Sequence, residues 1–401
     1  MPESDFDGLR AEVGAAVRQP DFGTVRGRAR AVRRRRTVAS AFFAAVLVLA
    51  GLGVAVRGTA DERPAVPAAA PTLDQDAAWP RMTSATAGGT DLYGLLTRCT
   101  TCPPEFYASS DDGASWERRT VPPATGSGGD ARRAVLTSLA PETVVWHEIP
   151  LNETPRRLWI TGDGGRTWRR AAVDTTPVDA VPAGTRPVDC DHLLALPDCA
   201  VAVLDPATGR FAPLAAQPTG IDVRARWTAD VTAPADGRLW VPGLEPVTNK
   251  PAVATSADAG RTWRTHVFAG ADVAVTDLAM HVPQVAAGPD GTAYVQTYRA
   301  GDRSDTYYTV DGGTTWQAGA TIAGAVLADS FVTADGLHVV RTWAGPLGGR
   351  GAEPYTPVDL PGFPADAVQP EPVAAGRYLV ASETGPYLSE DGRTWRRHRL
   401  P

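Results

Sequence analysis

The stretch TGDGGRTW, at Thr161–Trp168, decides the fold of this chain, because close copies of it recur along the sequence. The other full copies are SSDDGASW at Ser109–Trp116, SADAGRTW at Ser256–Trp263 and TVDGGTTW at Thr309–Trp316. A shorter fifth copy, SEDGRTW at Ser389–Trp395, lacks one residue before its glycine. An internal repeat with a period of tens of residues indicates structural units that are stacked or arranged in a ring.

Each copy has the residues of a tight turn between two strands. An Asp side chain can bond backbone amides two or three residues on, and Gly adopts backbone angles that strain other residues. The Trp ring is large, apolar and suited to packing between sheet layers. Short β-prone runs such as Glu105–Ser109 and Arg157–Ile160 precede most copies, which predicts hairpins. The structural residues are Asp111, Gly113, Trp116, Asp163, Gly165, Trp168, Asp258, Gly260, Trp263, Asp311, Gly313, Trp316, Asp391, Gly392 and Trp395.

The five copies resemble the Asp-box, also called the bacterial neuraminidase repeat. This resemblance implies that each copy lies between the last two strands of a four-stranded β-propeller blade. It covers roughly residues 79–401, and it identifies a blade rather than an activity.

The spacing of the copies predicts the number of blades. Their Asp residues lie 52, 95, 53 and 80 positions apart, and one blade takes about 40–50 residues. Each long gap therefore predicts a blade without a copy. We place these blades at Ala200–Leu214 and at Phe331–Trp343, the second with Glu353–Leu360 as its outer pair. The prediction is an all-β, seven-bladed propeller that begins at Trp79–Ala87 and closes by packing blade 7 on blade 1; six blades is the alternative.

The N-terminal region predicts a membrane anchor. Residues 37–56 (TVASAFFAAVLVLAGLGVAV) are 20 positions without a charge, and a helix of that length spans about 30 Å, the hydrocarbon core of a bilayer. The arginines just before it, Arg26, Arg28, Arg30 and Arg33–Arg36, place residues 1–36 in the cytoplasm. Residues 57–78 form a Pro/Ala-rich linker, and the propeller of 79–401 lies outside the cell. A cleaved secretory signal is the alternative, although its apolar core is normally shorter.

The charge distribution bears on the partners. Residues 1–36 carry nine arginines and five acidic residues, a net charge of +4, whereas the whole chain is −6, so the remainder is −10. An acidic domain is a poor nucleic-acid binder. In the leader, Phe6, Leu9, Val13 and Val17 fall at helical spacing, which predicts a short amphipathic helix that docks a cytoplasmic partner; the alternative is a marginal helix on the membrane or a disordered segment.

Four cysteines form two local pairs. Cys99 and Cys102 (CTTC) follow the β-prone run Leu92–Arg98, and Cys190 and Cys199 bracket DHLLALPD. An even number of cysteines beyond the membrane favours disulfides. We expect pairing within each local pair, because the two lie in blades that are not neighbours. A redox-active CxxC lacks its usual structural context, and the second pair is too widely spaced for a four-Cys zinc site.

The Asp-box is best known from sialidases, so the resemblance raises the question of a glycosidase. It would imply three arginines on a substrate carboxylate, a Tyr nucleophile with a Glu partner, and an Asp acid/base. The phrase Trp79–Thr83 (WPRMT) lacks the expected arginine pattern. The available tyrosines, Tyr294, Tyr298, Tyr307 and Tyr308, fit strand alternation equally well, and the six histidines have no metal-ligand spacing. We therefore assign no catalytic residue, no cofactor and no metal ligand.

Three functions follow from these observations. The first is a membrane-anchored extracytoplasmic propeller that binds a protein or a glycan. The second is an exo-sialidase-like glycoside hydrolase with its site at the central channel. The third is a transmembrane signalling receptor whose leader binds a cytoplasmic regulator. The identity of the ligand is not encoded in any motif of the sequence.

Overall fold

The computed structural model describes residues 79–400 with short gaps. The gaps are 100–101, 124–132, 150–156, 191–193, 195–198, 206–207, 224–236, 269, 271–281, 300–302, 325, 343, 368–369 and 375–376. The predicted leader, transmembrane helix and linker therefore lie outside the described residues. Within the described part, no helix has the length and apolarity to cross a membrane.

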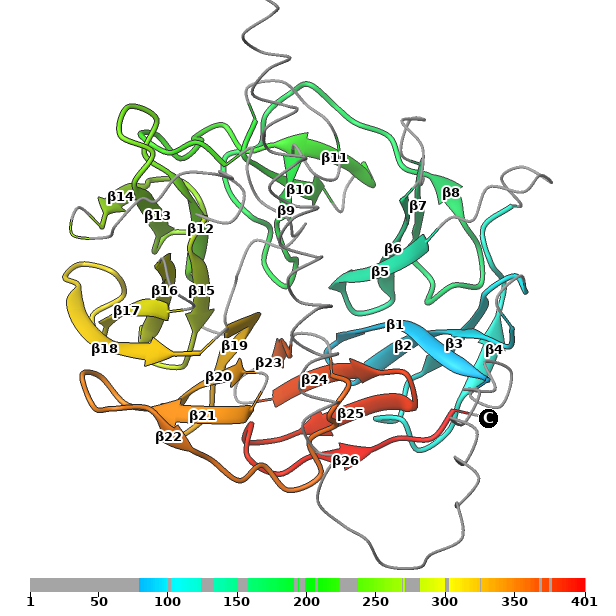
Figure 1. Ribbon diagram of the computed structural model, residues 1–401. Helices are drawn as coiled ribbons and strands as arrows, with labels where there is room; N and C mark the ends of the chain where they lie inside the picture. The colour runs from blue at the N-terminus through cyan, green and yellow to red at the C-terminus, as the bar shows by residue number, and fades with distance from the viewer. Residues whose placement is uncertain are drawn as a thin grey trace, which may run out of the picture. The chain divides into compact units, whose positions relative to one another are not determined.

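The described residues form seven antiparallel sheets, the blades of a β-propeller (Figure 1). Five blades have four strands in chain order, from the inner to the outer edge. Blades 1 and 2 contain β1 (Arg81–Gly88), β2 (Asp91–Thr97), β3 (Glu105–Ser109), β4 (Glu117–Arg119), β5 (Arg133–Ala140), β6 (Thr143–Ile149), β7 (Arg157–Thr161) and β8 (Arg169–Arg170). Blades 5 to 7 contain β15 (Gln284–Ala287), β16 (Ala293–Arg299), β17 (Arg303–Thr309), β18 (Gln317–Ala323), β19 (Val326–Val332), β20 (His338–Thr342), β21 (Gly345–Gly349), β22 (Thr356–Pro357), β23 (Glu371–Ala374), β24 (Arg377–Ser382), β25 (Gly385–Ser389) and β26 (Arg396–Arg397).

Blades 3 and 4 are three-stranded sheets. In each of them a nearby segment of the same chain lies where the fourth strand would be. They contain β9 (Val188–Asp189), β10 (Val201–Asp205), β11 (Arg210–Pro213), β12 (Leu239–Leu244), β13 (Pro251–Ser256) and β14 (Arg264–Val267). Val173 and Val178 form parallel bridges with Phe211 and Leu214 of blade 3, so the segment that precedes the blade occupies its outer position. At the inner edge of blade 4, Asp222 exchanges two backbone hydrogen bonds with Leu244, at 2.7 and 2.9 Å.

The prediction of seven blades is confirmed, and the six-bladed alternative is wrong. The strand pair expected at Ala200–Leu214 is β10 and β11. The outer pair expected at Glu353–Leu360 needs a correction, because that stretch supplies only β22, and the third strand of blade 6 is β21. The chain turns back directly after β20, where the Thr342 hydroxyl donates to the Gly345 carbonyl at 2.8 Å and Gly345 adopts a φ of 123° that other residues avoid.

The hydrophobic core is divided among the junctions between blades. Seven clusters of buried side chains each draw on two successive blades. The junction of blades 1 and 2, for example, buries Leu95 and Phe106 against Leu136 and Trp146. Because apolar burial is the main favourable term in folding, each blade is stabilised by its two neighbours, and the ring holds as a unit.

The Trp side chains of the repeated turns close these junctions. Trp168 of blade 2 lies 5.5 Å from the Phe106 ring of blade 1 at an interplanar angle of 70°. Trp395 of blade 7 lies 5.9 Å from Phe331 of blade 6 at 87°. Such edge-to-face contacts are favoured between aromatic rings. Each Trp therefore fixes its own turn to the preceding blade.

Polar side chains protect the inner edge of blade 2, and a backbone hydrogen bond joins the two ends of the ring. The Ser84 and Thr86 hydroxyls on β1 accept hydrogen bonds from the amides of Leu136 and Ser138 on β5, at 3.0 and 2.9 Å. An unpaired strand edge otherwise leaves amides unsatisfied. At the closure, Met82 N donates to Glu383 O at 2.9 Å, so blade 7 packs on blade 1 as expected and no strand is shared.

Candidate functional site

The repeated turns and the turns between first and second strands lie at the same end of each blade, because neighbouring strands run antiparallel. We call this end of the propeller the turn face. A pocket of about 290 Å³ lies in its centre, lined by residues of blades 1, 2, 4 and 7 and by residues 181–187. The lining includes Gly88, Pro141, Leu239 and Val373. Because these blades surround the ring centre, the pocket lies at the centre of the ring, and we call it the channel mouth.

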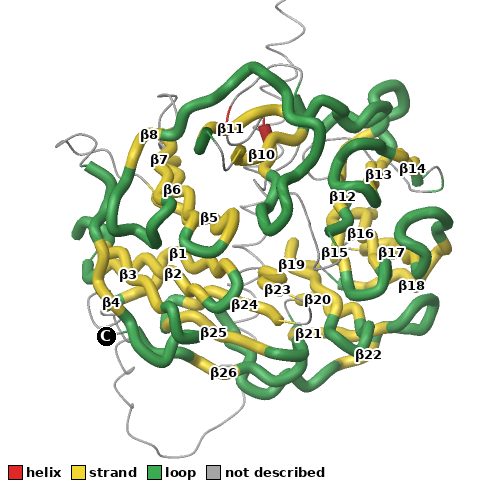
Figure 2. Tube along the Cα trace, turned by 180° about the vertical axis from the view of Figure 1, so that it is seen from behind, coloured by secondary structure: helices red, strands yellow, loops and turns green. Residues whose placement is uncertain are grey.

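A strap, residues 179–187, forms one wall of the pocket. It belongs to the connection between β8 and β9, which extends from the edge of the ring to its middle in both views (Figure 1, Figure 2). Val181 N donates to Ala259 O of blade 4 at 2.8 Å, and Arg186 N donates to Leu139 O of blade 2 at 2.7 Å. The strap is therefore tied to the blades on both sides of its own.

Arg186 connects the strap to the far side of the mouth. Its guanidinium forms an ion pair with Glu371 and donates to Pro372 O at 2.7 Å, both in blade 7. The Glu371 carboxylate also accepts the Thr86 hydroxyl of blade 1, at 3.3 and 3.4 Å. Both charged side chains are about one-quarter exposed. Because opposite charges neutralise each other here, the pair orders the strap and adds no net charge to the pocket.

The walls of the pocket are chemically simple. They consist of Gly, Ala, Pro, Val and Leu, and the polar side chains among them are those of Thr185 and Arg186. Its volume is about 290 Å³. Sites for drug-sized ligands usually have volumes of about 300–1,000 Å³, so this pocket is slightly smaller. The pocket can hold one small apolar group of a ligand, while the polar groups next to it in the ligand remain outside the pocket.

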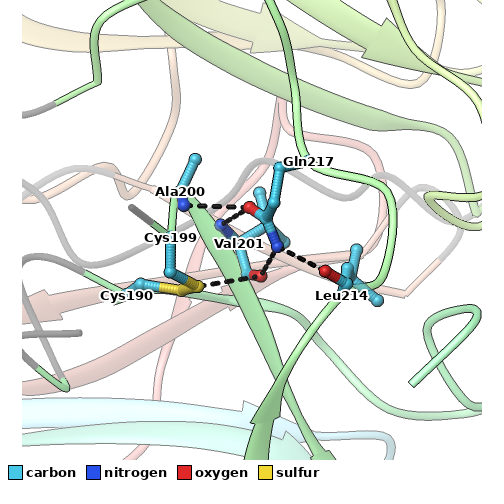
Figure 3. The surroundings of a disulfide bond; sticks show 6 residues. All are labelled: Cys190, Cys199, Ala200, Val201, Leu214 and Gln217. Carbon is cyan, nitrogen blue, oxygen red and sulfur yellow. Dashed lines mark hydrogen bonds between the residues drawn. A yellow bond between two sulfur atoms is a disulfide. The ribbon is translucent and has the colours of Figure 1, made fainter. Parts of the chain in front are cut away.

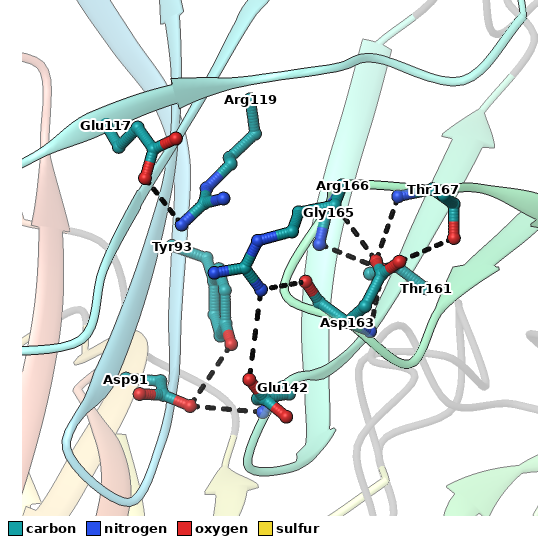
Figure 4. Close-up of polar contacts among 10 residues, drawn as sticks. All are labelled: Asp91, Tyr93, Glu117, Arg119, Glu142, Thr161, Asp163, Gly165, Arg166 and Thr167. Carbon is teal, nitrogen blue, oxygen red and sulfur yellow. Dashed lines mark hydrogen bonds and ion pairs between the residues drawn. The ribbon is translucent and has the colours of Figure 1, made fainter.

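The repeated turns share one hydrogen-bond pattern, shown for blade 2 in Figure 4. The Thr161 hydroxyl donates to Asp163 Oδ1 at 2.7 Å and accepts the Gly165 amide at 2.8 Å. The amide and hydroxyl of Thr167 donate to the two oxygens of Asp163, at 2.9 and 2.6 Å. Corresponding bonds hold Asp111, Asp258 and Asp311, and in the shorter copy the Thr394 amide donates to Asp391 at 2.9 Å. In blade 2 the amides three and four residues after the Asp, those of Arg166 and Thr167, both donate to Asp163, so the bond three residues on agrees with the expectation and the bond four residues on extends it.

These bonds keep the turn carboxylates ionised. Hydrogen bonds from the hydroxyl and amide of Ser115 lower the pKa of Asp111 to about 2, and Thr262 and Thr315 do the same for Asp258 and Asp311. For Asp163, burial raises the pKa, but the bonds from Thr167 and Thr161 outweigh it and bring the pKa to about 2. The turn face therefore carries fixed negative charges at neutral pH.

Asp91, Glu142 and Asp163 lie at the junction of blades 1 and 2, together with Arg119 and Arg166 (Figure 4). Asp91 accepts the Tyr93 hydroxyl at 3.4 Å and the Glu142 amide at 3.1 Å. Arg166 lies 3.9 Å from Glu142 and donates to the backbone oxygen of Asp163 at 2.9 Å. Burial, followed by the charge of Asp91, raises the pKa of Tyr93 above its usual range. Of these three carboxylates, the one near the Arg166 guanidinium is that of Glu142.

Both predicted disulfides are present, Cys99–Cys102 and Cys190–Cys199. The first closes the hairpin between β2 and β3, at the end of the propeller opposite the turn face. The second lies in blade 3 beside Gln217 (Figure 3). The Gln217 amide oxygen accepts the Ala200 and Val201 amides at 2.9 Å, and its nitrogen donates to Val201 O and Leu214 O at 2.9 and 2.7 Å. The surroundings of both disulfides therefore indicate a structural role.

The residues considered for a sialidase site are dispersed. Arg81 pairs with Glu383 at the ring closure, 3.2 Å away. Tyr294 is buried and stacks on His338 at 4.4 Å. The Tyr107 hydroxyl does bond Glu105 at 2.9 Å, but this pair lies on β3, the third strand of blade 1, away from the channel. Among the described residues, no group of His, Cys, Asp and Glu has the geometry of a metal site.

The strap and the Arg186–Glu371 pair were not found by sequence reasoning. Their sequence, VPAGTRPVD around Arg186 and QPEPV around Glu371, has the composition of ordinary connections. The contact joins positions 185 residues apart. The one available signal was the length of the connection after the second repeated turn, and spacing alone did not say where it leads.

No protein-family model matches the chain, and no curated protein matches it. Solved structures of propellers are similar to it at low identity. The structure of YCF48 bound to D1 peptide is 15% identical over 71% of this chain and 80% of that chain, with a TM-score of 0.34. Penicillium chrysogenum alpha-L-arabinanase complexed with arabinobiose is 15% identical over 79% and 91%, with a TM-score of 0.34. The Dos1 propeller is 9% identical over 77% and 80%, with a TM-score of 0.42. At these identities and TM-scores, the likenesses assign no activity, ligand or partner.

Proposed function

We propose that the propeller is a binding module for a protein partner, which inserts an apolar group into the pocket at the channel mouth. The observation that carries this proposal is the pocket itself, about 290 Å³ with walls of small apolar side chains. Four blades and the strap fix the positions of those walls. A preformed pocket favours binding because little ordering is needed when the ligand enters.

The chemistry of the pocket favours a protein over a glycan. A sugar presents many hydroxyls, and burying them without hydrogen-bond partners is unfavourable. Among the lining residues, Thr185 and Arg186 offer polar side chains, and Arg186 is already paired with Glu371. An aliphatic side chain on a partner loop meets no such penalty, and burying it contributes about 1.5–3 kcal/mol.

A glycoside hydrolase is the competing function, and it makes a different demand. Such enzymes usually place two carboxyl groups on either side of the scissile bond. Among the described residues that line the pocket, none carries a carboxylate. Incubation of the full-length protein with fluorogenic sialosides and arabinosides should give no release above a protein-free blank. If the protein hydrolysed one of these substrates, and hydrolysis fell in a variant whose pocket is filled by a larger side chain, the binding proposal would be replaced by an enzymatic one.

The anchoring of this module follows from the sequence. The uncharged stretch 37–56 supports a single transmembrane helix, with the propeller on the extracytoplasmic side. The hydrogen-bonded turns support the resemblance to the Asp-box. Alkaline carbonate should leave the chain in the membrane fraction, and protease added outside the cell should reach the propeller. Full extraction by carbonate would contradict the anchor. A cytoplasmic partner for residues 1–36 stays a prediction.

Filling the pocket tests the binding proposal. We expect peptides selected from a random dodecapeptide phage library on the full-length protein to lose at least tenfold in affinity for Ala183→Trp, because Ala183 lines the pocket and is exposed enough to accept a larger side chain. Val310→Trp is the matched control, since Val310 is 63% exposed within the repeated turn of blade 5, outside the lining. Equal losses in both variants, or none in either, would contradict the site.

A further inference from the structure

Arg186 is the charged side chain of the pocket wall. Among the described lining residues, no other side chain carries a charge. Its guanidinium pairs with Glu371 and donates to Pro372 O at 2.7 Å. The N–H bonds of a guanidinium lie in its plane, so these two contacts engage its edge. The side chain remains 26% exposed, which leaves the flat face of the guanidinium and its apolar stem for contact with a ligand.

The charges in contact with the pocket wall are balanced. Glu371 neutralises Arg186. Arg377 of blade 7 donates to the Gly89 carbonyl of the lining at 3.0 Å, and its guanidinium pairs with two carboxylates outside the lining, at 3.4 and 2.5 Å. A charged group of a ligand would lose its hydration here without gaining an unpaired partner, which is unfavourable. The pocket therefore favours a neutral group.

Prolines line the pocket on several sides. Pro141 lies in the turn between β5 and β6, Pro182 and Pro187 belong to the strap, and Pro372 lies on β23 of blade 7. A proline ring loses almost no side-chain entropy when it is buried. Its C–H groups beside the amide nitrogen are slightly positive, and the negative face of an aromatic ring attracts them weakly. Such walls suit a flat and rigid group.

We infer that the group which the partner inserts is a single aromatic ring, that of a Phe or a Tyr, and that it stacks on the Arg186 guanidinium. This inference rests on the proposed function and names the chemistry of the inserted group. An aliphatic side chain gains only from apolar burial. An aromatic ring gains the same burial and also a cation–π contact, which Arg forms through its planar face. The hydroxyl of a Tyr would stay at the mouth, in water.

The first measurement compares two ligands on the unaltered protein. Random dodecapeptides are selected on the full-length chain, and the best peptide is synthesised with its aromatic residue and again with cyclohexylalanine in that place. Cyclohexylalanine keeps the size and apolarity of Phe and removes the π system. We expect the cyclohexyl peptide to bind about threefold to tenfold more weakly, as the loss of one cation–π contact predicts. This result does not depend on the folding of any variant.

The second measurement repeats the comparison on a double variant, Arg186→Met with Glu371→Gln, which removes the cation without leaving a lone carboxylate. The affinity ratio of the two peptides should fall to about one. A shift of the strap would weaken both peptides, so the ratio isolates the contact between the ring and the guanidinium. Arg166→Met is the matched control and should keep the ratio, because Arg166 is 55% exposed and does not line the pocket.

The outcomes separate this inference from the proposed function. Support requires selected peptides that share a Phe or Tyr, loss of their binding in Ala183→Trp, and the fall of the affinity ratio in the double variant alone. Peptides that need the pocket but share only aliphatic residues, or a cyclohexyl peptide that binds as tightly as the aromatic one, overturn this inference and leave the proposed function standing. Aromatic peptides that bind Ala183→Trp as well as the unaltered chain overturn the proposed function. A selection without binders above an albumin control contradicts both.

Discussion

Blades 2 and 3 secure the same kind of sheet with different devices. In blade 2, Asp163 and Thr161 hold a tight turn through bonds to residues within the same short stretch. In blade 3, which has no copy of the turn, the Gln217 amide bonds backbone groups of Ala200, Val201 and Leu214. The comparison shows that each blade needs its backbone groups satisfied, and that the device which satisfies them can change.

The two devices differ in what surrounds them. The turn of blade 2 is close to solvent, but Gly165 within it packs against the Phe106 ring of blade 1. Gln217 lies beside the Cys190–Cys199 disulfide and next to the buried strand β10 (Figure 3). We therefore expect stability to change little when the carboxylate of the local turn is replaced, and to change strongly when its glycine is replaced. In blade 3, we expect stability to depend on the Gln217 side chain itself.

The largest effect should come from Gly165→Ala. A Cβ at this position would meet the Phe106 ring at 2.1 Å, and the residue has a φ of 87°. Overpacking and left-handed strain together should lower the free energy of unfolding by about 3 kcal/mol. Urea unfolding followed by Trp fluorescence measures this. Gly162→Ala in the same turn is the control, because nothing lies within 4 Å of its added Cβ; equal effects in the two variants would refute the packing argument.

A smaller loss should follow Gln217→Leu, which keeps the volume and removes all four hydrogen bonds. The Ala200 and Val201 amides and the Leu214 carbonyl lose that partner, and each buried unsatisfied group costs about 1–3 kcal/mol before relaxation. We expect a net loss of about 2 kcal/mol in the same urea experiment. The matched change in blade 2, Asp163→Asn, retains an acceptor oxygen and should cost about 1 kcal/mol or less. The reverse order would break the comparison between the blades.

The smallest effect should be local and depend on pH. The folded pKa of Asp163 is about 2, below its ordinary 3.8. A lowered pKa stabilises the folded state above the ordinary value, and this contribution is lost as pH falls through the folded one. Amide exchange at Arg166 and Thr167, corrected for intrinsic rates, should therefore accelerate between about pH 4 and pH 2. The Ala200 and Val201 amides should not follow, because the Gln217 amide does not titrate; parallel acceleration at both places would contradict this.

The sequence was most informative where structure depends on neighbouring residues. The repeated turn lies within eight positions, and its spacing predicted the blade number, the strand pairs around the turns and the phase of the ring. The same is true of the disulfides, each formed between nearby cysteines. The misplaced outer pair of blade 6 shows the limit, because Gly345 starts a third strand with too little β-prone sequence to be noticed.

The candidate site depends on contacts that sequence spacing does not reveal. The strap reaches Ala259, Leu139 and Glu371 in three different blades. The outer position of blade 3 is filled by the segment that precedes the blade, through bridges at Val173 and Val178. Both features place a connecting segment against distant strands. Periodicity within the chain carries no information on such placement, so only the structure reveals the pocket.

The central claim is that a protein partner inserts into the channel mouth. Its most direct test is site-specific photo-cross-linking in cells that produce the full-length chain, with a photoreactive residue at Thr185 of the strap. The same residue at Val247 is the control, because Val247 is 87% exposed on the loop between β12 and β13, opposite the turn face. We predict a discrete protein adduct from position 185, absent from position 247 and abolished by Ala183→Trp. An adduct that forms equally at both positions, or survives Ala183→Trp, would contradict the account.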